Sequence, residues 1–295
     1  MKFPFNAPLT ITVLSWGFNF VALKVLYREM SAPVVGLLRY LLMFGVLVGI
    51  CLIQKESLKP ARRDFWHIQA VGFLAMGLYM VLFLEGIRFT SPAVCAILLA
   101  TAPVWTYLLS CGFRQERFQL SAMLGAVVAF GGVTLVILGG AAAGHGTLYG
   151  DIIVLISAFV WACSAVLMKP LLSRYKPTTV LTMSMPGALP VLIPYGLGAT
   201  LNTNYAAISA TGWFMFATTV LMSGVVAFIC FYTGLRQIGA SGAALYQYLV
   251  PPTAALFAWA LMGKSLGPIQ FVGLAVVLIG VAYAGRARQV APPLE

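Results

Sequence analysis

Charged residues are scarce in this chain, and their scarcity excludes a soluble globular domain. Only 8% of the 295 residues are Asp, Glu, Lys or Arg, whereas 61% are hydrophobic. Soluble domains carry roughly a quarter charged residues because their surfaces face water. A chain with so few charges cannot cover a water-exposed surface, so we expect a lipid bilayer to be its solvent.

Histidine is rare as well, and the cysteines are not paired in sequence. The two histidines are His67 and His145, and the glycine-rich stretch 139–150 lacks the Lys-Ser/Thr of a phosphate-binding loop. The cysteines are spread over apolar segments, as is typical of small buried residues: Cys51, Cys95, Cys111, Cys163 and Cys230. We therefore expect no metal site, no cofactor and no enzymatic activity.

Long apolar runs make up most of the chain. A helix needs about 20 apolar residues to cross a bilayer core, and ten segments reach or approach that length. They are 7–27, 33–53, 67–88, 92–112, 118–138, 151–172, 177–197, 213–235, 240–262 and 267–285. The first segment lacks a small-residue cleavage site, so we interpret it as a retained helix. The sequence thus predicts an all-α integral membrane protein with ten transmembrane helices.

The cations are distributed unevenly between the loops. With the N-terminus placed in the cytoplasm, thirteen of the eighteen Lys and Arg residues lie on the cytoplasmic side and four lie on the outer side. Arg39 is the remaining one and lies within the second span. This asymmetry predicts that both termini are cytoplasmic. It also accounts for most of the net charge of +11, so we expect no nucleic-acid partner.

The two halves of the chain repeat each other. At an offset of 148 residues, GIRFTSPAVCAILLATAP (86–103) aligns with GLRQIGASGAALYQYLVP (234–251), and at an offset of 145 Trp16 aligns with Trp161. Each half, 1–145 and 146–295, then holds five spans, and because five is odd the second half enters the membrane from the opposite side. Inverted repeats of this kind are typical of secondary transporters, although a duplication without a transport role stays open.

Several motifs, in this order, resemble those of a known family. They are WGFNF early in the first span, P-x5-R-Y (33–40) in the second, and small residues followed by proline in the fourth and ninth. Together with the five-plus-five organisation, they make the chain similar to the drug/metabolite transporter superfamily, in its EamA-type ten-helix form, amino-acid exporter branch. The resemblance implies ten helices around a central cavity and transport of amino acids, other metabolites, sugars, nucleotide-sugars or drugs. One position departs from the family pattern: Lys264 stands where many members have an acid after the ninth helix.

Polar and aromatic residues near the middle of spans are the candidates for substrate binding. Inverted repeats place their binding site near the bilayer midplane, and a polar side chain there must face protein or a cavity. Asn19 has hydrogen bonding to a neighbouring helix as an alternative role, and the aromatic residues have core packing. The candidates are Trp16, Asn19, Tyr79, Phe83, Trp161, Ser164, Tyr232, Tyr246 and Gln247.

No charged residue lies at the predicted midplanes, and this limits the substrate. The acids are few, and Glu85 comes closest, near the outer end of the third span. A proton-coupled drug exporter needs a buried carboxylate, and a phosphate carrier needs cavity cations. We therefore expect a facilitator of small neutral or zwitterionic metabolites, above all amino acids, aromatic ones included, without obligatory ion coupling. Drug or toxic-compound efflux and a nucleotide-sugar carrier are the alternatives.

The remaining expectations are a bacterial inner (plasma) membrane location, membrane lipid as a partner, and a monomer or homodimer.

Two further groups suggest moving parts. Glu85 is a candidate to pair with Lys24 or Arg39 as an outer gate, with snorkelling of the cations to the headgroups as the alternative. The seventh span carries Pro186, Pro190 and Pro194 at a spacing of four, on one face. Each proline removes a backbone hydrogen bond, so they form a candidate hinge, or else a static kink.

Overall fold

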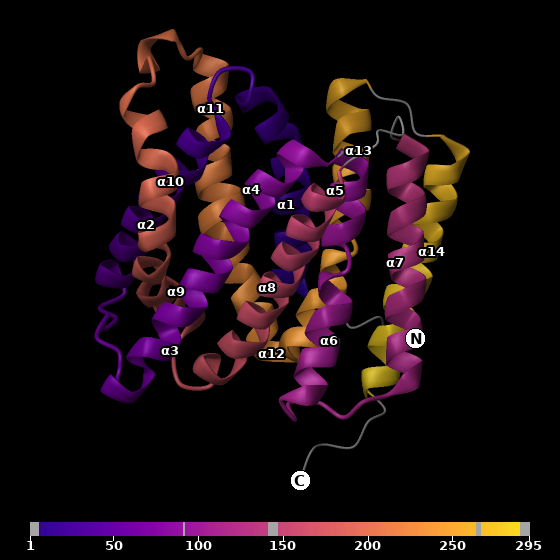
Figure 1. Cartoon of the computed structure of the whole chain (residues 1–295). Helices are drawn as coiled ribbons and strands as arrows, with labels where there is room; N and C mark the ends of the chain where they lie inside the picture. The colour runs from indigo at the N-terminus through magenta and orange to yellow at the C-terminus, as the bar shows by residue number, and fades with distance from the viewer. Residues whose placement is uncertain (1–5, 91, 141–146, 264–266, 290–295) are drawn as a thin grey trace.

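The computed structural model describes residues 6–90, 92–140, 147–263 and 267–289, and all regular structure in these ranges is helical (Figure 1). The first half contains α1 (Ala7–Leu26), α2 (Ala32–Ile53), α3 (Arg62–Gly72), η1 (Phe73–Leu78), α4 (Tyr79–Phe89), α5 (Pro92–Leu99), α6 (Ala102–Gly112) and α7 (Leu120–Gly140). The second half contains α8 (Leu148–Leu172), α9 (Pro177–Ser184), η2 (Met185–Ala188), α10 (Leu189–Leu201), η3 (Tyr205–Ala207), α11 (Ala210–Thr218), η4 (Thr219–Val226), α12 (Ala227–Gln247), α13 (Val250–Met262) and α14 (Pro268–Gln289).

Capping residues and prolines set several of the helix starts. The Asn6 side chain accepts a hydrogen bond from the Leu9 amide at the start of α1, and Thr147 and Ser209 cap α8 and α11 in the same way. Such caps satisfy amide groups that have no partner inside the helix. Proline at the first positions of α2, α9, α13 and α14 favours helix initiation there, since its missing N–H would be unpaired in any case.

The described residues contain nine continuous apolar helices long enough to cross a membrane. The longest of them, Ala210–Gln247, has 38 residues and would extend about 57 Å if straight, far more than one bilayer core of about 30 Å. It bends at Gly239, whose φ of 79° and ψ of 170° are not helical. The part after the bend continues into α13, a shorter apolar helix, so a further apolar helical segment lies where the sequence predicts its ninth span.

Irregular turns occur at matching places in the two halves. The π-helical turn η1 spans Phe73–Leu78 in the first half, and η4 spans Thr219–Val226 in the second. The fourth predicted span is interrupted at 100–101, between α5 and α6, and the ninth at 248–249, between α12 and α13. The second interruption lies 148 residues after the first, at the same offset that aligns the two halves of the sequence.

Helices α7 and α14 form an antiparallel pair at one side of the molecule (Figure 1). A methyl group added at Gly125 would lie 2.5 Å from the Ala284 backbone nitrogen, and one added at Gly132 would lie 2.5 Å from that of Val277. Small residues permit backbones to approach this closely in membranes. Gly273 and Gly280 of α14 meet α7 equally closely, so these glycines hold the two helices together.

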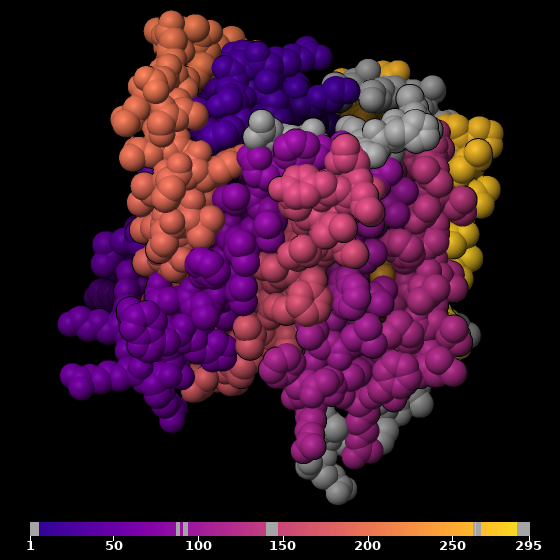
Figure 2. All heavy atoms as spheres, viewed as in Figure 1, coloured from indigo at the N-terminus to yellow at the C-terminus, as the bar shows by residue number. Residues whose placement is uncertain are grey.

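The two halves also interleave elsewhere. In Figure 2, α10 and α11, in orange, lie beside the indigo segment that joins α1 to α2, in agreement with the contacts between α10 and α2 and between α11 and α1. Another close crossing joins α3 to η2, where a methyl group on Gly187 would lie 2.1 Å from the Gln69 carbonyl oxygen. The core is therefore built between the halves, and a space left inside it has walls from both.

Candidate functional site

A central cavity of about 460 Å³ lies between the two halves, within the range of small-molecule sites. Its walls come from α1, α2, η1, α4, α5 and α6 of the first half, and from α8, α10, α12 and α13 of the second. No described residue of α7 or α14 lines it. The cavity extends to Tyr27 and Ala32, where α1 ends and α2 begins. We call this the α1–α2 end of the molecule.

Helical spacing determines which side chains of α1 and α2 line the cavity. On α1, Trp16, Asn19, Phe20 and Leu23 lie three to four residues apart and form one stripe. Helix α2 presents a stripe of the same kind. Along this stripe, Arg39 lies between smaller residues on one side and the deeper Tyr40 and Met43 on the other. The α2 stripe is Ala32, Val35, Gly36, Arg39, Tyr40 and Met43.

Aromatic rings from four elements form the deep wall of the cavity. The Trp16 ring centroid lies 6.0 Å from that of Trp161 and 5.4 Å from that of Phe228, both in edge-to-face arrangements. Tyr79 lies 5.1 Å from Trp161. Edge-to-face and tilted pairs are the favoured packing of aromatic rings. The cluster joins α1 and α4 of the first half to α8 and α12 of the second.

Hydrogen bonds orient both indoles. The Trp16 Nε1–H donates to the carbonyl oxygen of Ser223 in η4, at 3.1 Å, and the Trp161 Nε1–H donates to Oε1 of Gln247, at 3.3 Å. Helix α1 is held in place beside η4 by a further hydrogen bond, which the Ser223 hydroxyl donates to the Ser15 carbonyl oxygen at 2.9 Å. Because buried indole N–H groups need a partner, these bonds give each ring one orientation.

In the described part of the chain, three buried polar atoms in the cavity walls have no hydrogen-bond partner. They are Oδ1 of Asn19, Nε2 of Gln247 and the hydroxyl of Tyr248. Buried polar groups are normally paired, and an unpaired one costs free energy. These atoms therefore offer acceptor and donor capacity to water or to a solute in the cavity.

Six of the nine predicted substrate-binding residues line this cavity, and they come together from four elements. They are Trp16, Asn19, Tyr79, Phe83, Trp161 and Gln247. Their sequence positions extend over more than two hundred residues, and the packing of the helices brings them to one cavity. Whether they bind substrate remains a prediction.

The other three predicted residues do not line the cavity in this conformation. Ser164 is buried, and its hydroxyl donates to the Trp161 carbonyl within α8. Tyr232 is buried behind the aromatic cluster against Phe231. Tyr246 lies elsewhere in α12, where its hydroxyl accepts a hydrogen bond from the Asn6 amide. Each has a residue type or a position along its helix that suits substrate binding. Its helix is oriented, however, so that the side chain points toward protein and not into the cavity.

Arg39 corrects the expectation that the cavity contains no cation. It lines the cavity, half-buried, because the cavity extends from the aromatic cluster to the end of α1 instead of being confined to the midplane. Arg39 makes no ion pair with Glu85, nor with any other residue among those described, and Glu85 does not line the cavity. Lys264, the position that departs from the family pattern, lies outside the described residues.

The prolines of the seventh span coincide with a change of helix type. Pro186 lies in the 3-10 turn η2, Pro190 lies at the start of α10, and Pro194 lies inside α10. The carbonyl oxygen of Met185, in the same turn, accepts a hydrogen bond from the Tyr40 hydroxyl. The distortion expected from proline is present here, and its use as a hinge remains a prediction.

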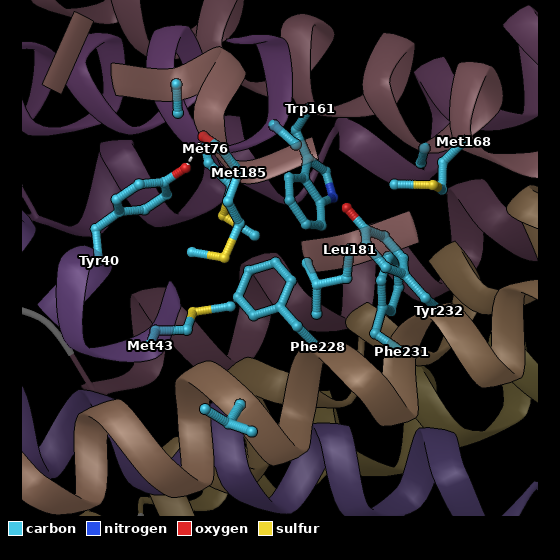
Figure 3. Packing of buried hydrophobic residues seen from close by; sticks show 14 of the residues in the cluster. Tyr40, Met43, Met76, Trp161, Met168, Leu181, Met185, Phe228, Phe231 and Tyr232 are labelled. Carbon is cyan, nitrogen blue, oxygen red and sulfur yellow. Dashed lines mark hydrogen bonds between the residues drawn. The ribbon is translucent and has the colours of Figure 1, made fainter. Parts of the chain in front are cut away.

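Apolar side chains close the molecule below the aromatic cluster. Figure 3 shows Met43, Met76 and Met185 on one side of Leu181 and Phe228, and Met168, Phe231 and Tyr232 on the other side. Met168, Leu181 and Met185 are fully buried. The cavity is therefore sealed on the side away from the α1–α2 end.

Polar ties between the halves reinforce the sealed end. Arg174 Nη1 lies 2.6 Å from Oδ1 of the buried Asp64, and the Tyr175 hydroxyl donates to Oδ2 at 2.8 Å. Lys176 forms an ion pair with Glu56, and its hydrogen bond holds the pKa of the Glu56 carboxyl below its usual range. Asp64 lies in the first turn of α3 and Glu56 lies in the loop after α2, and both are tied to the turn between α8 and α9.

Several lining residues were not among the sequence candidates: Phe20, Tyr27, Tyr40, Met43, Met76 and Leu99. Their residue types are common throughout the chain, so composition gave no signal. The three- and four-residue spacing along α2 from Ala32 to Met43 does place them on one face. From sequence, that face of α2 can be identified as cavity-lining only if the Arg39 side chain is assumed to point into the protein.

The chain matches a known protein family along most of its length. The sequence profile of the EamA-like transporter family matches residues 9–138 and again residues 148–286. The chain belongs to the EamA-like transporter family. It is therefore an integral membrane protein of the drug/metabolite transporter superfamily, and the family assignment made from motifs is confirmed.

Relatives of the family span nearly the same length. The chain is 26% identical over 281 residues to an uncharacterized transporter of Archaeoglobus fulgidus, covering 95% of this chain and 98% of the relative. It is 27% identical over 293 residues to a probable terminal-alkyne amino-acid exporter of Streptantibioticus cattleyicolor, covering 97% and 96%. A solved crystal structure with 17% identity superposes with a TM-score of 0.80 over 96% of this chain and 97% of that chain, which supports the fold.

Proposed function

We propose that this EamA-like transporter exports small neutral or zwitterionic metabolites, above all amino acids including aromatic ones, by alternating access. The observation that carries the proposal is the cavity between the halves, with a wall of Trp16, Trp161 and Phe228 and a few unpaired polar atoms. Aromatic walls suit apolar side chains, and unpaired polar atoms suit the backbone groups of an amino acid. The name of the Streptantibioticus cattleyicolor relative agrees with this solute class.

Alternating access rests on two inverted repeats, 1–145 and 146–295. Three observations support this division: the family profile matches each half once, the irregular turns recur at equivalent places, and α7 and α14 pair antiparallel. Repeat-equivalent helices that run antiparallel are expected when the axis relating the halves lies in the membrane plane. The two halves then exchange roles as the cavity opens to one side and the other.

The orientation in the membrane follows from the cations. The sealed end carries Lys55, Arg62, Arg63, Arg174 and Lys176, and Lys and Arg accumulate on the cytoplasmic side. In this orientation both termini are cytoplasmic, the membrane is a bacterial inner membrane, and the cavity is open outward. The transporter then acts as a monomer or as a homodimer.

Transport proceeds without obligatory ion coupling. No acidic residue lines the cavity in the described part of the chain, and a proton-coupled carrier needs a group there that takes up and releases the proton. The single lining cation, Arg39, gives little support to a nucleotide-sugar carrier, because a diphosphate is better matched by several cations. The solute therefore moves down its own gradient.

Purified protein in vesicles tests this function. We expect uptake of labelled L-phenylalanine and L-leucine above protein-free vesicles, with the same rate when protonophore and sodium ionophore are added. The lipophilic cation tetraphenylphosphonium, a probe for drug efflux, should not be taken up. Uptake of this cation alone, or amino-acid uptake only with an imposed pH gradient, contradicts the proposal.

A further inference from the structure

The central cavity has a charge asymmetry. Among the described residues that line it, Arg39 is the only charged one, and the remainder are apolar, aromatic or neutral polar. Isolated cations within membrane proteins are costly and mark functional sites unless they are paired or hydrated. The cavity thus carries one positive charge with no built-in counterion in its walls.

Arg39 is unpaired among the residues that the structure describes. Neither an ion pair nor a hydrogen bond from Arg39 occurs in the described part of the chain, and the hydroxyl-bearing side chains that line the cavity with it include Tyr27 and Tyr79. A guanidinium presents several N–H donors in a fixed fork that matches a carboxylate. Because Arg39 is half-buried and lines the cavity, an anionic group in the cavity is able to reach these donors.

The distance from Arg39 to the aromatic cluster suits a small molecule. Met43 lies one helical turn deeper on the same face of α2 and packs with Phe228 (Figure 3), about 6 Å further along the helix axis. Tyr79, beside Arg39, lies 5.1 Å from the Trp161 ring. A solute whose anion lies at Arg39 therefore places its next few carbon atoms against these rings.

Resting on the proposed transport function, we propose that Arg39 binds the carboxylate of the transported solute while the aromatic cluster holds its apolar body. The cavity supplies a charged partner for the carboxylate and none for an ammonium group. The carboxylate is thus required and the ammonium is not: aromatic monocarboxylates without an amino group bind, and amines of the same shape are excluded by repulsion from Arg39.

Snorkelling is the competing role for Arg39. A long cationic stem that only reaches the headgroup region contributes nothing to solute selection. The two roles differ in one observable, because only carboxylate binding makes the choice between acid and amine depend on Arg39.

Competition in vesicles separates the two roles. The probes are L-phenylalanine, 3-phenylpropionate and 2-phenylethylamine, which share a ring and differ in their charged groups. For the wild-type protein, we expect unlabelled phenylpropionate to compete with labelled phenylalanine and phenylethylamine not to compete. An amine that competes as well as the acid overturns the inference without any mutation.

Variants then assign the effect to Arg39. Arg39→Gln should weaken the apparent affinity for both carboxylates by about 10- to 100-fold, and Arg39→Lys should weaken it less while it keeps the preference for acid over amine. Arg28→Gln, an exposed arginine at the same end, is the matched control and should behave as wild type. If Arg39→Gln does not fold, Arg39→Lys and the wild-type ranking carry the test.

The outcomes distinguish the inference from the proposed function. Wild-type affinity for phenylalanine in Arg39→Gln overturns the carboxylate site and leaves amino-acid transport standing. A wild-type protein that transports neither phenylalanine nor phenylpropionate contradicts the transport function and the site together.

Discussion

Trp16 and Trp161 occupy matching offsets in the two halves, and the structure brings them into one aromatic cluster with ring centroids 6.0 Å apart. Tryptophan favours the membrane interface, so two indoles at mid-helix positions need another explanation. Hydrogen bonds to Ser223 and Gln247 fix both rings as cavity walls. At the scale of single residues, we propose that this wall contacts the apolar part of the solute.

We predict that Trp161→Ala weakens the apparent affinity for labelled L-phenylalanine by about tenfold, because the loss of ring contacts costs about 0.5–1.5 kcal/mol beyond the area lost. Trp259→Ala is the control, since Trp259 is 54% exposed on the outside of α13. Affinity is measured by uptake, and folding by thermal unfolding of the purified variants. Equal losses of affinity in the two variants would show that the indole acts only through stability.

The sequence predicts how far along its helix a residue lies, but it does not predict whether the side chain points into the cavity or toward a neighbouring helix. Trp16, Asn19 and Trp161 were found because uncommon residue types stood out in apolar spans. Ser164 and Tyr246 have comparable residue types and depth, yet neighbouring helices cover them. Arg39 was expected to act as a gate, and its place in the cavity depends on how α2 is rotated against α4 and α10, which no local pattern encodes.

At the scale of helices, the α7–α14 pair is the best-defined packing unit. Its glycines alternate with larger residues, so each backbone lies in the groove of the other helix. Neither helix lines the cavity. The pair therefore supports the remaining helices, and changes within it should act on stability before they act on transport.

We predict that Gly132→Val lowers the unfolding temperature by several degrees, because its side chain would collide with the Val277 backbone, at a cost of about 1–3 kcal/mol. Gly131→Val changes the neighbouring residue to the same side chain, and nothing lies within 4 Å of its position. The measurement is thermal unfolding in detergent. A Gly131 variant as unstable as the Gly132 variant would show that helix propensity, and not close packing, determines the effect.

The sequence located the helices to within a few residues, apart from their irregular turns. Long apolar runs defined the spans, and the short gap before 240 coincides with the bend at Gly239. The third helix begins at Arg62, five residues before the predicted start, because Arg62, Arg63 and Asp64 form a polar first turn that apolar counting omits. The π-helical turns depend on tertiary packing, which overrides local propensity.

At the scale of the whole molecule, the two ends differ. The α1–α2 end leads into the cavity, and the opposite end is closed by apolar packing and by Asp64–Arg174 and Glu56–Lys176 between the halves. Cys51 lies at the closed end, fully buried, with its Sγ 3.4 Å from the Thr182 hydroxyl of the other half. If the halves separate there during transport, Cys51 becomes accessible.

We predict that Arg174→Gln increases labelling of Cys51 by a membrane-impermeant maleimide about tenfold, in a variant whose other cysteines are replaced. Removal of Arg174 leaves the buried Asp64 carboxylate without its close partner, a cost of about 1–3 kcal/mol at a partly exposed pair. Arg63→Gln is the control, since Arg63 is 76% exposed and lies 4.0 Å from Asp64. Unchanged labelling in Arg174→Gln would exclude this ion pair as a latch on the closed end.

The measurement that tests the account most directly is counterflow in vesicles without any ion gradient. Vesicles loaded with unlabelled L-phenylalanine are diluted into a trace of labelled L-phenylalanine, and the internal label is followed over time. A carrier with one alternately accessible site should accumulate label transiently above its external concentration, and Trp161→Ala should reduce this accumulation. Label that merely equilibrates, or that accumulates only under an imposed pH gradient, would contradict uncoupled alternating access through the central cavity.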